Sequence, residues 1–159
     1  MQKTIRLQFL LMAFIFLSPL YTLQAQFVAR MEIKSPIEGV CNLNEVYALF
    51  PMLEGHEEAV CPIPEAYLLK RLNNEVDFLK EHKNYNDQGM IKMIINCQGL
   101  VVKCIMDDPT ENEVLDRQIE EVFNTLGEWK SGRFLGRNVD SARLFTFRIV
   151  NGVFTFNLN

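Results

Sequence analysis

Four cysteines are the residues best suited to covalent chemistry in this 159-residue chain. Cys41 and Cys61 bracket a proline-containing stretch, and a disulfide between them would stabilise the fold by about 3 kcal/mol in the chain-entropy model. Cys97 and Cys104 cannot pair with each other, because on the two strands of a tight hairpin they would lie about 13 Å apart. We therefore expect either a Cys41–Cys61 disulfide with Cys97 and Cys104 free, or two disulfides that cross from this stretch to the hairpin.

A zinc site is another use for some of these residues. Cys41, His56 and Cys61 carry the thiol and imidazole groups that zinc prefers as ligands. The run His56-Glu57-Glu58 matches the first half of a zinc-deaminase motif, but the Pro-Cys-x-x-Cys half is missing from the sequence. We expect no metal.

Carboxylates are plentiful, but their spacing does not favour acid-base catalysis. Asp116, Glu120 and Glu121 fall on the polar side of a predicted helix, whereas a catalytic pair needs two carboxyl groups in unlike, partly buried environments. The sequence also lacks a nucleophile elbow, a phosphate-binding glycine loop and a dinucleotide motif. It predicts a protein without cofactor and without enzymatic activity.

Composition narrows the class of protein further. Apolar residues make up 48% of the chain and charged residues 23%, with a formal net charge of −4. This apolar fraction excludes intrinsic disorder, and the length is that of one domain. An acidic chain is a poor partner for nucleic acid or anionic membranes, because both require clustered basic side chains.

The first 25 residues have the pattern of a secretory signal peptide. Lys3 and Arg6 precede an apolar run over Leu7–Leu17, and Leu23–Ala25 offers small-residue cleavage. The run is too short for a membrane span, which needs about 20 apolar residues. We expect residues 1–25 to be removed, which leaves an exported chain without a membrane span.

Two regions are predicted after this leader. Residues 26–64, named the arm here, hold four of the six prolines and include one short predicted helix over Asn42–Phe50 with a capping box from Asn42 to Glu45. Residues 65–159 contain two helices and two hairpins in alternation. The first helix runs from Glu65 to about His82, and a hairpin of Met90–Asn96 and Leu100–Met106 follows it. The second helix covers Leu115–Leu126 and is preceded by a Thr110–Glu113 capping box. The last hairpin consists of Leu144–Val150 and Val153–Leu158 around the Asn151-Gly152 turn.

This order predicts an α+β two-layer sandwich. We expect an antiparallel sheet of three to four strands with the two main helices on one face. A loop over Glu128–Asp140 joins the second helix to the last hairpin and contains the only tryptophan, Trp129. Trp129 is expected to anchor this loop on the sheet, and Gly132 and Gly136 to let the chain reverse.

Residues 66–157 resemble the C-terminal domain of TonB, the energy transducer of Gram-negative outer-membrane transport. The resemblance rests on the loop pattern Trp-x-x-Gly-x-x-x-Gly-x-x-Val, which is formed by Trp129, Gly132, Gly136 and Val139. The helix before this loop, the strand after it and the first hairpin with its glycine turn agree in order and spacing. Two prolines of the family pattern are replaced by Ser131 and Asn138.

The resemblance implies a binding module of the periplasm rather than an enzyme. Members of the family bind an extended segment of an outer-membrane receptor, the TonB box, by adding it as a strand to a sheet edge. The edge strand implied for this chain consists of Ser141, Ala142, Arg143, Leu144, Phe145, Thr146, Phe147 and Arg148.

Two departures from a complete transducer accompany this implication. A cleavable leader would replace the membrane anchor and long spacer, so this chain is not expected to couple to an inner-membrane motor. The Asn151-Gly152 turn also folds Val153–Phe156 back onto the implied edge. The alternative is a structural or self-associating envelope domain, in which the same edge pairs with another copy of the chain.

Overall fold

The computed structural model describes residues 29–31 and 36–156, so the predicted signal peptide at 1–25 lies outside the described residues. The elements follow in the order β1 (Ala29–Met31), β2 (Val46–Ala48), β3 (His56–Glu57), α2 (Glu65–Glu75), α3 (Asp77–Glu81), β4 (Asp87–Ile95), β5 (Val101–Asp108), α4 (Glu113–Asn124), β6 (Gly132–Phe134), β7 (Arg137–Val139), β8 (Ser141–Val150) and β9 (Val153–Phe156). No helix among them combines the length and apolar character that crossing a membrane requires.

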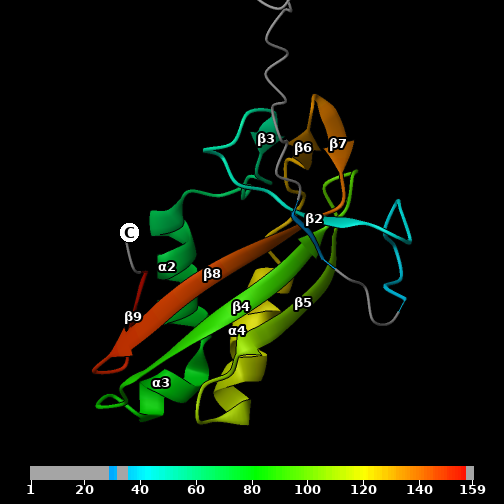
Figure 1. Cartoon of the computed structure of the whole chain (residues 1–159). Coiled ribbons are helices and arrows are strands. Elements are labelled where there is room, and N and C mark those ends of the chain that lie inside the picture. The colour runs from blue at the N-terminus through cyan, green and yellow to red at the C-terminus, as the bar shows by residue number, and fades with distance from the viewer. Residues whose placement is uncertain (1–28, 32–35, 157–159) are drawn as a thin grey trace, which may run out of the picture.

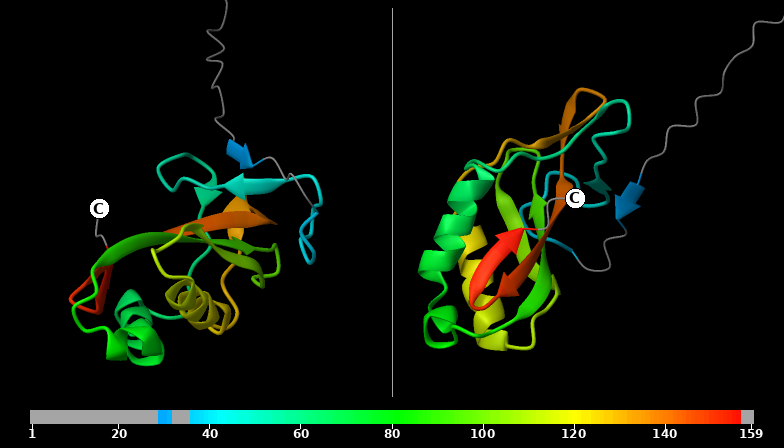
Figure 2. Two further views of the ribbon diagram at one scale, coloured as in Figure 1. Left: turned by 90° about the horizontal axis from the view of Figure 1, so that it is seen from below. Right: turned by 90° about the vertical axis from the view of Figure 1, so that its left-hand side faces the viewer.

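A six-stranded sheet forms one of two layers. Its strand order is β1-β2-β8-β4-β5, and β9 pairs with β8 beside this path. The three helices α2, α3 and α4 cover one face of the sheet (Figure 1), and the edge-on views show the two layers (Figure 2). The predicted α+β class with helices on one face is confirmed.

The sheet is larger than predicted and is mixed rather than antiparallel. The arm supplies β2, which runs parallel to β8 with Tyr47 opposite Ser141 and Ala48 opposite Ala142. The arm also supplies β3, which pairs with β6 in a separate three-stranded sheet of order β3-β6-β7. The predicted helix over Asn42–Phe50 is wrong, because this segment contains β2 and the Asn42 side chain instead accepts a bond from the Asn44 N–H at 3.0 Å.

Strands β4 and β8 form the centre of the sheet. They pair antiparallel along nine positions, with Ile91 opposite Phe145 and Gly89 opposite Phe147. Gly89 leaves room for the Phe147 ring, since a Cβ at position 89 would lie 2.7 Å from it. The apolar face of these strands packs against buried side chains of the helices, which include Leu68, Leu72, Leu79, Leu115, Ile119, Val122 and Phe123.

A side-chain cap begins α4, whereas α2 and α3 begin without one. The first predicted helix is divided at Val76, whose extended backbone separates α2 from α3. The N-cap of α4 is Asn112, whose side chain accepts from the N–H groups of Val114 and Leu115. The predicted cap at Thr110 is wrong, because the Thr110 hydroxyl donates to Asp116 at 2.7 Å.

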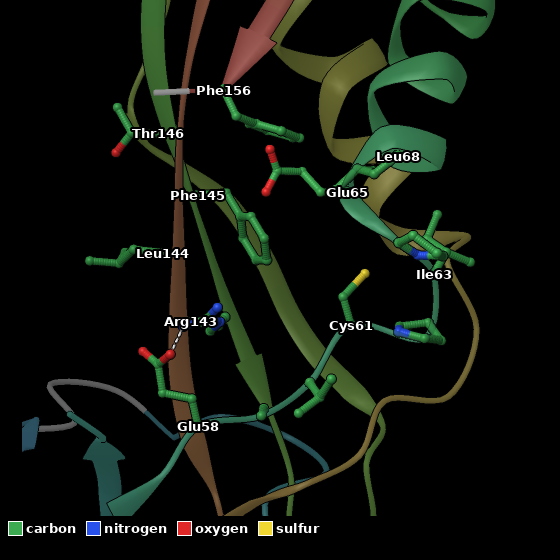
Figure 3. Close-up of a pocket in the computed structure, with 14 residues that line it drawn as sticks. Glu58, Cys61, Ile63, Glu65, Leu68, Arg143, Leu144, Phe145, Thr146 and Phe156 are labelled. Carbon is green, nitrogen blue, oxygen red and sulfur yellow. Dashed lines mark ion pairs between the residues drawn. The ribbon is translucent and has the colours of Figure 1, made fainter. Parts of the chain in front are cut away.

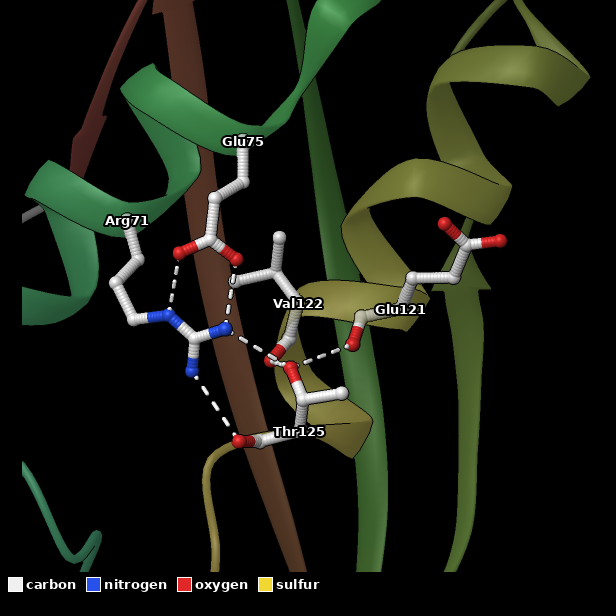
Figure 4. A network of polar contacts seen from close by, with 5 residues as sticks. All are labelled: Arg71, Glu75, Glu121, Val122 and Thr125. Carbon is white, nitrogen blue, oxygen red and sulfur yellow. Dashed lines mark hydrogen bonds and ion pairs between the residues drawn. The ribbon is translucent and has the colours of Figure 1, made fainter.

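An exposed polar network ties α2 to the end of α4 (Figure 4). Arg71 donates two hydrogen bonds of 2.6 Å to Glu75 and one of 3.3 Å to the carbonyl of Thr125. The hydrogen bond from Arg71 holds the pKa of the Glu75 carboxyl below its usual value. Because the pair is solvent-accessible, we expect it to add less than about 1 kcal/mol.

The two predicted hairpin turns are present. Asn151 and Gly152 have φ angles of 50° and 73°, as a primed two-residue turn requires. Gly99, with φ of 88°, forms the turn between β4 and β5 against the Trp129 backbone, where a Cβ would lie 2.0 Å from the carbonyl oxygen. The loop predicted over Glu128–Asp140 contains a further hairpin, β6–β7, which reverses at Leu135 and Gly136 with φ of 48° and 78°.

A disulfide joins the arm to the turn that follows β4. Cys41 is bonded to Cys97, and Cys61 and Cys104 are free, so the predicted Cys41–Cys61 pairing is wrong. Of the alternative, in which two disulfides cross from the arm to the hairpin, one disulfide is present. The reason lies in Asp140, which is 2% exposed. The N–H groups of Cys41 and Cys97 both donate to Asp140 Oδ1, at 3.1 and 2.9 Å, and this shared acceptor brings the two segments together.

Candidate functional site

Strand β8, which contains the predicted binding edge, is open along only part of its length. On the side away from β4, β2 pairs with Ser141 and Ala142, and β9 pairs with Phe147–Val150. Among the described strands, the stretch Arg143–Thr146 therefore has a neighbour on the β4 side only. Val153–Phe156 folds back onto the implied edge as the sequence indicated and covers it from Phe147 onward, so the open part of Ser141–Arg148 is these four residues.

A groove of about 640 Å³ lies beside this stretch. Its walls are the open part of β8, the segment of residues 58–65 that leads into α2, and Phe156 of β9 (Figure 3). Pro62 and Pro64 stiffen the facing segment, because proline fixes its backbone φ angle. The groove thus separates a partly unpaired strand from a wall that contains two prolines and bends at Pro62 and Ile63.

Phe145 forms the apolar floor of the groove. Its ring centroid lies 5.4 Å from that of Phe123, 5.9 Å from Trp129 and 6.4 Å from Phe156. Trp129 is 4% exposed, which confirms its predicted role as an anchor on the sheet. These aromatic contacts join the groove floor to the core, so the open stretch of β8 is held by the main body of the fold.

Arg143 is the basic side chain of the groove. Its guanidinium forms an ion pair with Glu58 on the facing segment and lies 5.4 Å from the centroid of the Phe145 ring. The Nε of Arg143 is buried and has no hydrogen-bond partner among the described residues. The donor is closed off from the groove in this conformation, so the charge of Arg143 is presented there only through the guanidinium that pairs with Glu58.

Cys61 is a free thiol in the wall of the groove, with its sulfur directed into the space (Figure 3). Burial raises the pKa of Cys61, and a backbone hydrogen bond at Ile63 and the charge of Arg143 oppose this shift. Cys104, on β5, has its pKa raised to about 12 by burial and by the nearby Glu120. Neither thiol is activated as a nucleophile, because activation requires a lowered pKa.

The residues of the loop pattern support β8 from its start. A Cβ at Gly132 would lie 2.5 Å from both Leu49 and the Ser141 hydroxyl, so the glycine lets β6 pass close to the first residue of β8. Val139 pairs with Gly132 across the β6–β7 hairpin, and Gly136 occupies its turn. These residues position the start of β8.

The other sequence-based candidates have structural roles. Cys41 is consumed by its disulfide, and His56 Nδ1 accepts from the Phe50 N–H at 3.3 Å. The carboxylate of Asp116 accepts from Thr110, as described above, and that of Glu120 accepts from the Met106 N–H at 2.8 Å. These contacts fix loops and strand ends.

A metal-type cluster does occur elsewhere, where Cys41, Cys97 and Asp140 bring possible ligand atoms within 4.8 Å of one another. The two sulfurs are bonded to each other, and the Asp140 carboxylate accepts three backbone N–H groups, from Cys41, Asn42 and Cys97. The cluster is therefore already satisfied as a crosslink with a hydrogen-bonded anchor.

Sequence reasoning missed the wall opposite β8. Ile63, Glu65 and Phe156 line the groove, yet no motif includes them, and Glu58 stood out only as part of the His56-Glu57-Glu58 run. The Cys61–Pro64 run was the available signal, since two prolines two positions apart indicate a stiff extended segment. No protein-family model matches this chain, and neither the curated proteins nor the solved structures include a significant match.

Proposed function

We propose that this chain is a binding module that takes up an extended segment of a partner protein as an additional strand on Arg143–Thr146. The observation that supports this function best is the one-sided pairing of this stretch beside an apolar groove. Strand addition supplies the missing backbone hydrogen bonds, and the groove accepts alternate side chains of the segment. This is the binding mode of the TonB C-terminal domains that the sequence resembles, for which the partner is an outer-membrane receptor in the periplasm.

The alternation of β8 divides the added segment into two faces. Phe145 and Phe147 face the helices, whereas Leu144 and Thr146 are exposed on the other side. A residue of the added strand opposite Phe145 would point into the groove, and its two neighbours would lie on the open face. The gap between β2 and β9 limits close pairing to about four residues.

Peptide binding to the full chain tests this function through its two free thiols. The probe is an acetylated and amidated heptapeptide of sequence Gly-Thr-Val-Xaa-Val-Thr-Gly, with norleucine at Xaa. We expect it to slow alkylation of Cys61 by iodoacetamide, because Cys61 lines the groove, and to leave the rate at Cys104 unchanged. Equal rates at Cys61 with and without saturating peptide contradict the proposal.

Backbone methylation of the probe identifies strand addition as the mode of binding. Only every second N–H of an added strand points toward its neighbour. We expect N-methylation at one alternate set of positions to abolish binding and at the other set to be tolerated. If both sets bind equally well, recognition rests on side chains alone and strand addition is wrong.

Self-association is the second candidate, and the position of β5 favours it. β5 stands at the end of the sheet order and, among the described strands, pairs with β4 alone. Two copies could therefore join through antiparallel β5 edges. Sedimentation over a range of concentrations separates the candidates, since a strict monomer excludes this one and leaves the peptide groove untouched.

A further inference from the structure

Three charged side chains line the groove, and one of them has no partner. Glu58 and Arg143 neutralise each other in an ion pair across the groove. The Glu65 side chain makes no hydrogen bond or ion pair within the described part of the chain. The groove therefore carries one uncompensated negative charge, on a chain whose net charge is already −4.

The Glu65 carboxylate lies where an added strand would pass. Glu65 is the first residue of α2, and its side chain extends into the groove toward β8, near Phe145 and Phe156 (Figure 3). The two ring centroids are 6.4 Å apart. An aromatic pair next to a carboxylate favours a cation, because the faces of the rings are negative and the carboxylate supplies a full opposite charge.

The geometry selects a long basic side chain over other types. A residue opposite Phe145 has to cover the aromatic rings with apolar atoms before it reaches Glu65. Lysine and arginine combine an aliphatic stem with a charged end and are known to extend in this way. An acidic residue would be repelled by Glu65, and an apolar residue would bury the carboxylate without a partner.

We propose that the groove is specific for an extended segment with lysine or arginine at the position opposite Phe145, and that Glu65 binds the charged end. This specificity rests on the proposed strand addition at Arg143–Thr146. The stem of the basic residue packs over Phe145 and Phe156. The partner is thus a protein with a basic residue inside an exposed extended segment.

A set of three heptapeptides tests the specificity on the full chain. The host is the same Gly-Thr-Val-Xaa-Val-Thr-Gly peptide, with lysine, norleucine or glutamate at Xaa, and affinity is measured by fluorescence anisotropy. We expect the lysine peptide to bind about five-fold more tightly than the norleucine peptide, the effect of one accessible ion pair, and the glutamate peptide to bind most weakly. Lysine and norleucine have stems of equal length, so the comparison isolates the charge.

Substitutions at Glu65 assign the preference to one side chain. Glu65→Gln should bring the lysine and norleucine peptides to equal affinity, and Glu65→Lys should reverse the order so that glutamate binds better than lysine. Glu113→Gln is the matched control, because Glu113 is also an exposed glutamate at the first position of a helix, α4, and is absent from the groove lining. It should leave all three affinities unchanged.

The failures of the two proposals are distinguishable. If all three peptides bind equally well to the native chain, or if Glu65→Gln keeps the preference for lysine, the specificity is wrong and strand addition stands. If none of the peptides binds and Cys61 is not protected, strand addition itself is wrong. Loss of the preference in Glu113→Gln would also overturn the assignment to Glu65.

Discussion

The arm and the region of residues 65–156 are held in the same fold by different forces. The region 65–156 buries most of the hydrophobic core, including Phe123 and Phe147, both 0% exposed. The described part of the arm buries few apolar side chains and exposes others, with Leu43 at 68% and Met52 at 87%. Its attachments include the Cys41–Cys97 disulfide, the Asp140 carboxylate, two short strand pairings, the Val60–Lys130 bridge and the Glu58–Arg143 ion pair.

This difference matters because the arm forms one wall of the candidate site. Apolar burial in the region 65–156 is non-directional and shared by many side chains. We therefore expect its helices and central strands to unfold together. The arm depends on a few directional contacts, and the loss of one of them can release a segment locally. We therefore expect the groove to vary with the attachment of the arm while β8 and its core contacts stay in place.

The largest effect should come from a core substitution in the region 65–156. Phe123→Ala removes a fully buried ring from α4 and should lower the free energy of unfolding by about 3–5 kcal/mol. Met52→Ala in the arm should change it by less than about 0.5 kcal/mol, because the side chain is 87% exposed. Urea unfolding followed by the fluorescence of Trp129 measures both, and similar costs would contradict the contrast.

A smaller and more local effect should follow from opening the disulfide. Cys41→Ala together with Cys97→Ala should destabilise the folded chain by about 2–4 kcal/mol. Hydrogen exchange should show faster exchange for amides around β2, and protected amides of α4 should change much less. Cys61→Ala is the control, because Cys61 is a free thiol. Equal acceleration in α4 and β2 would mean that the arm unfolds only together with the rest.

Sequence periodicity found the elements of the region 65–156 for a physical reason. The spacing of Leu115 and Ile119 reports a helix face that must be buried, and Asn151-Gly152 reports a turn with positive φ at both positions. Strands of two or three residues, such as β2 and β3, carry no measurable period. They form because the folded chain places another strand beside them. The identity of that neighbouring strand cannot be derived from local sequence spacing.

The candidate site shows the same division. The strand that contains Arg143–Thr146 was predictable, because its alternation and its place after the tryptophan loop are local features of the sequence. The facing wall was not, since Glu58 reaches β8 only through the path of the folded arm. The disulfide partner of Cys41 depended on Asp140, which is 99 residues away from it in the chain.

Asp140 provides the finest test of the contrast, because it anchors the arm without a covalent bond. Its carboxylate accepts N–H groups of Cys41, Asn42 and Cys97 at 3.1, 2.7 and 2.9 Å. Asp140→Asn keeps the size of the side chain but replaces one acceptor oxygen with a donor NH₂ group, which must face an N–H. We expect a loss of about 2 kcal/mol, the value of a hydrogen bond to a charged group.

The control for Asp140→Asn is Asp107→Asn, which breaks an accessible ion pair with Lys92 and should cost less than about 1 kcal/mol. With the disulfide intact, Asp140→Asn should also raise the hydrogen-exchange rate of the amides around β2, because this part of the arm loses its polar anchor. Asp107→Asn should leave this rate unchanged. If Asp140→Asn accelerates exchange equally in α4 and β2, the carboxylate supports the whole fold and the arm is not an independently releasable wall of the groove.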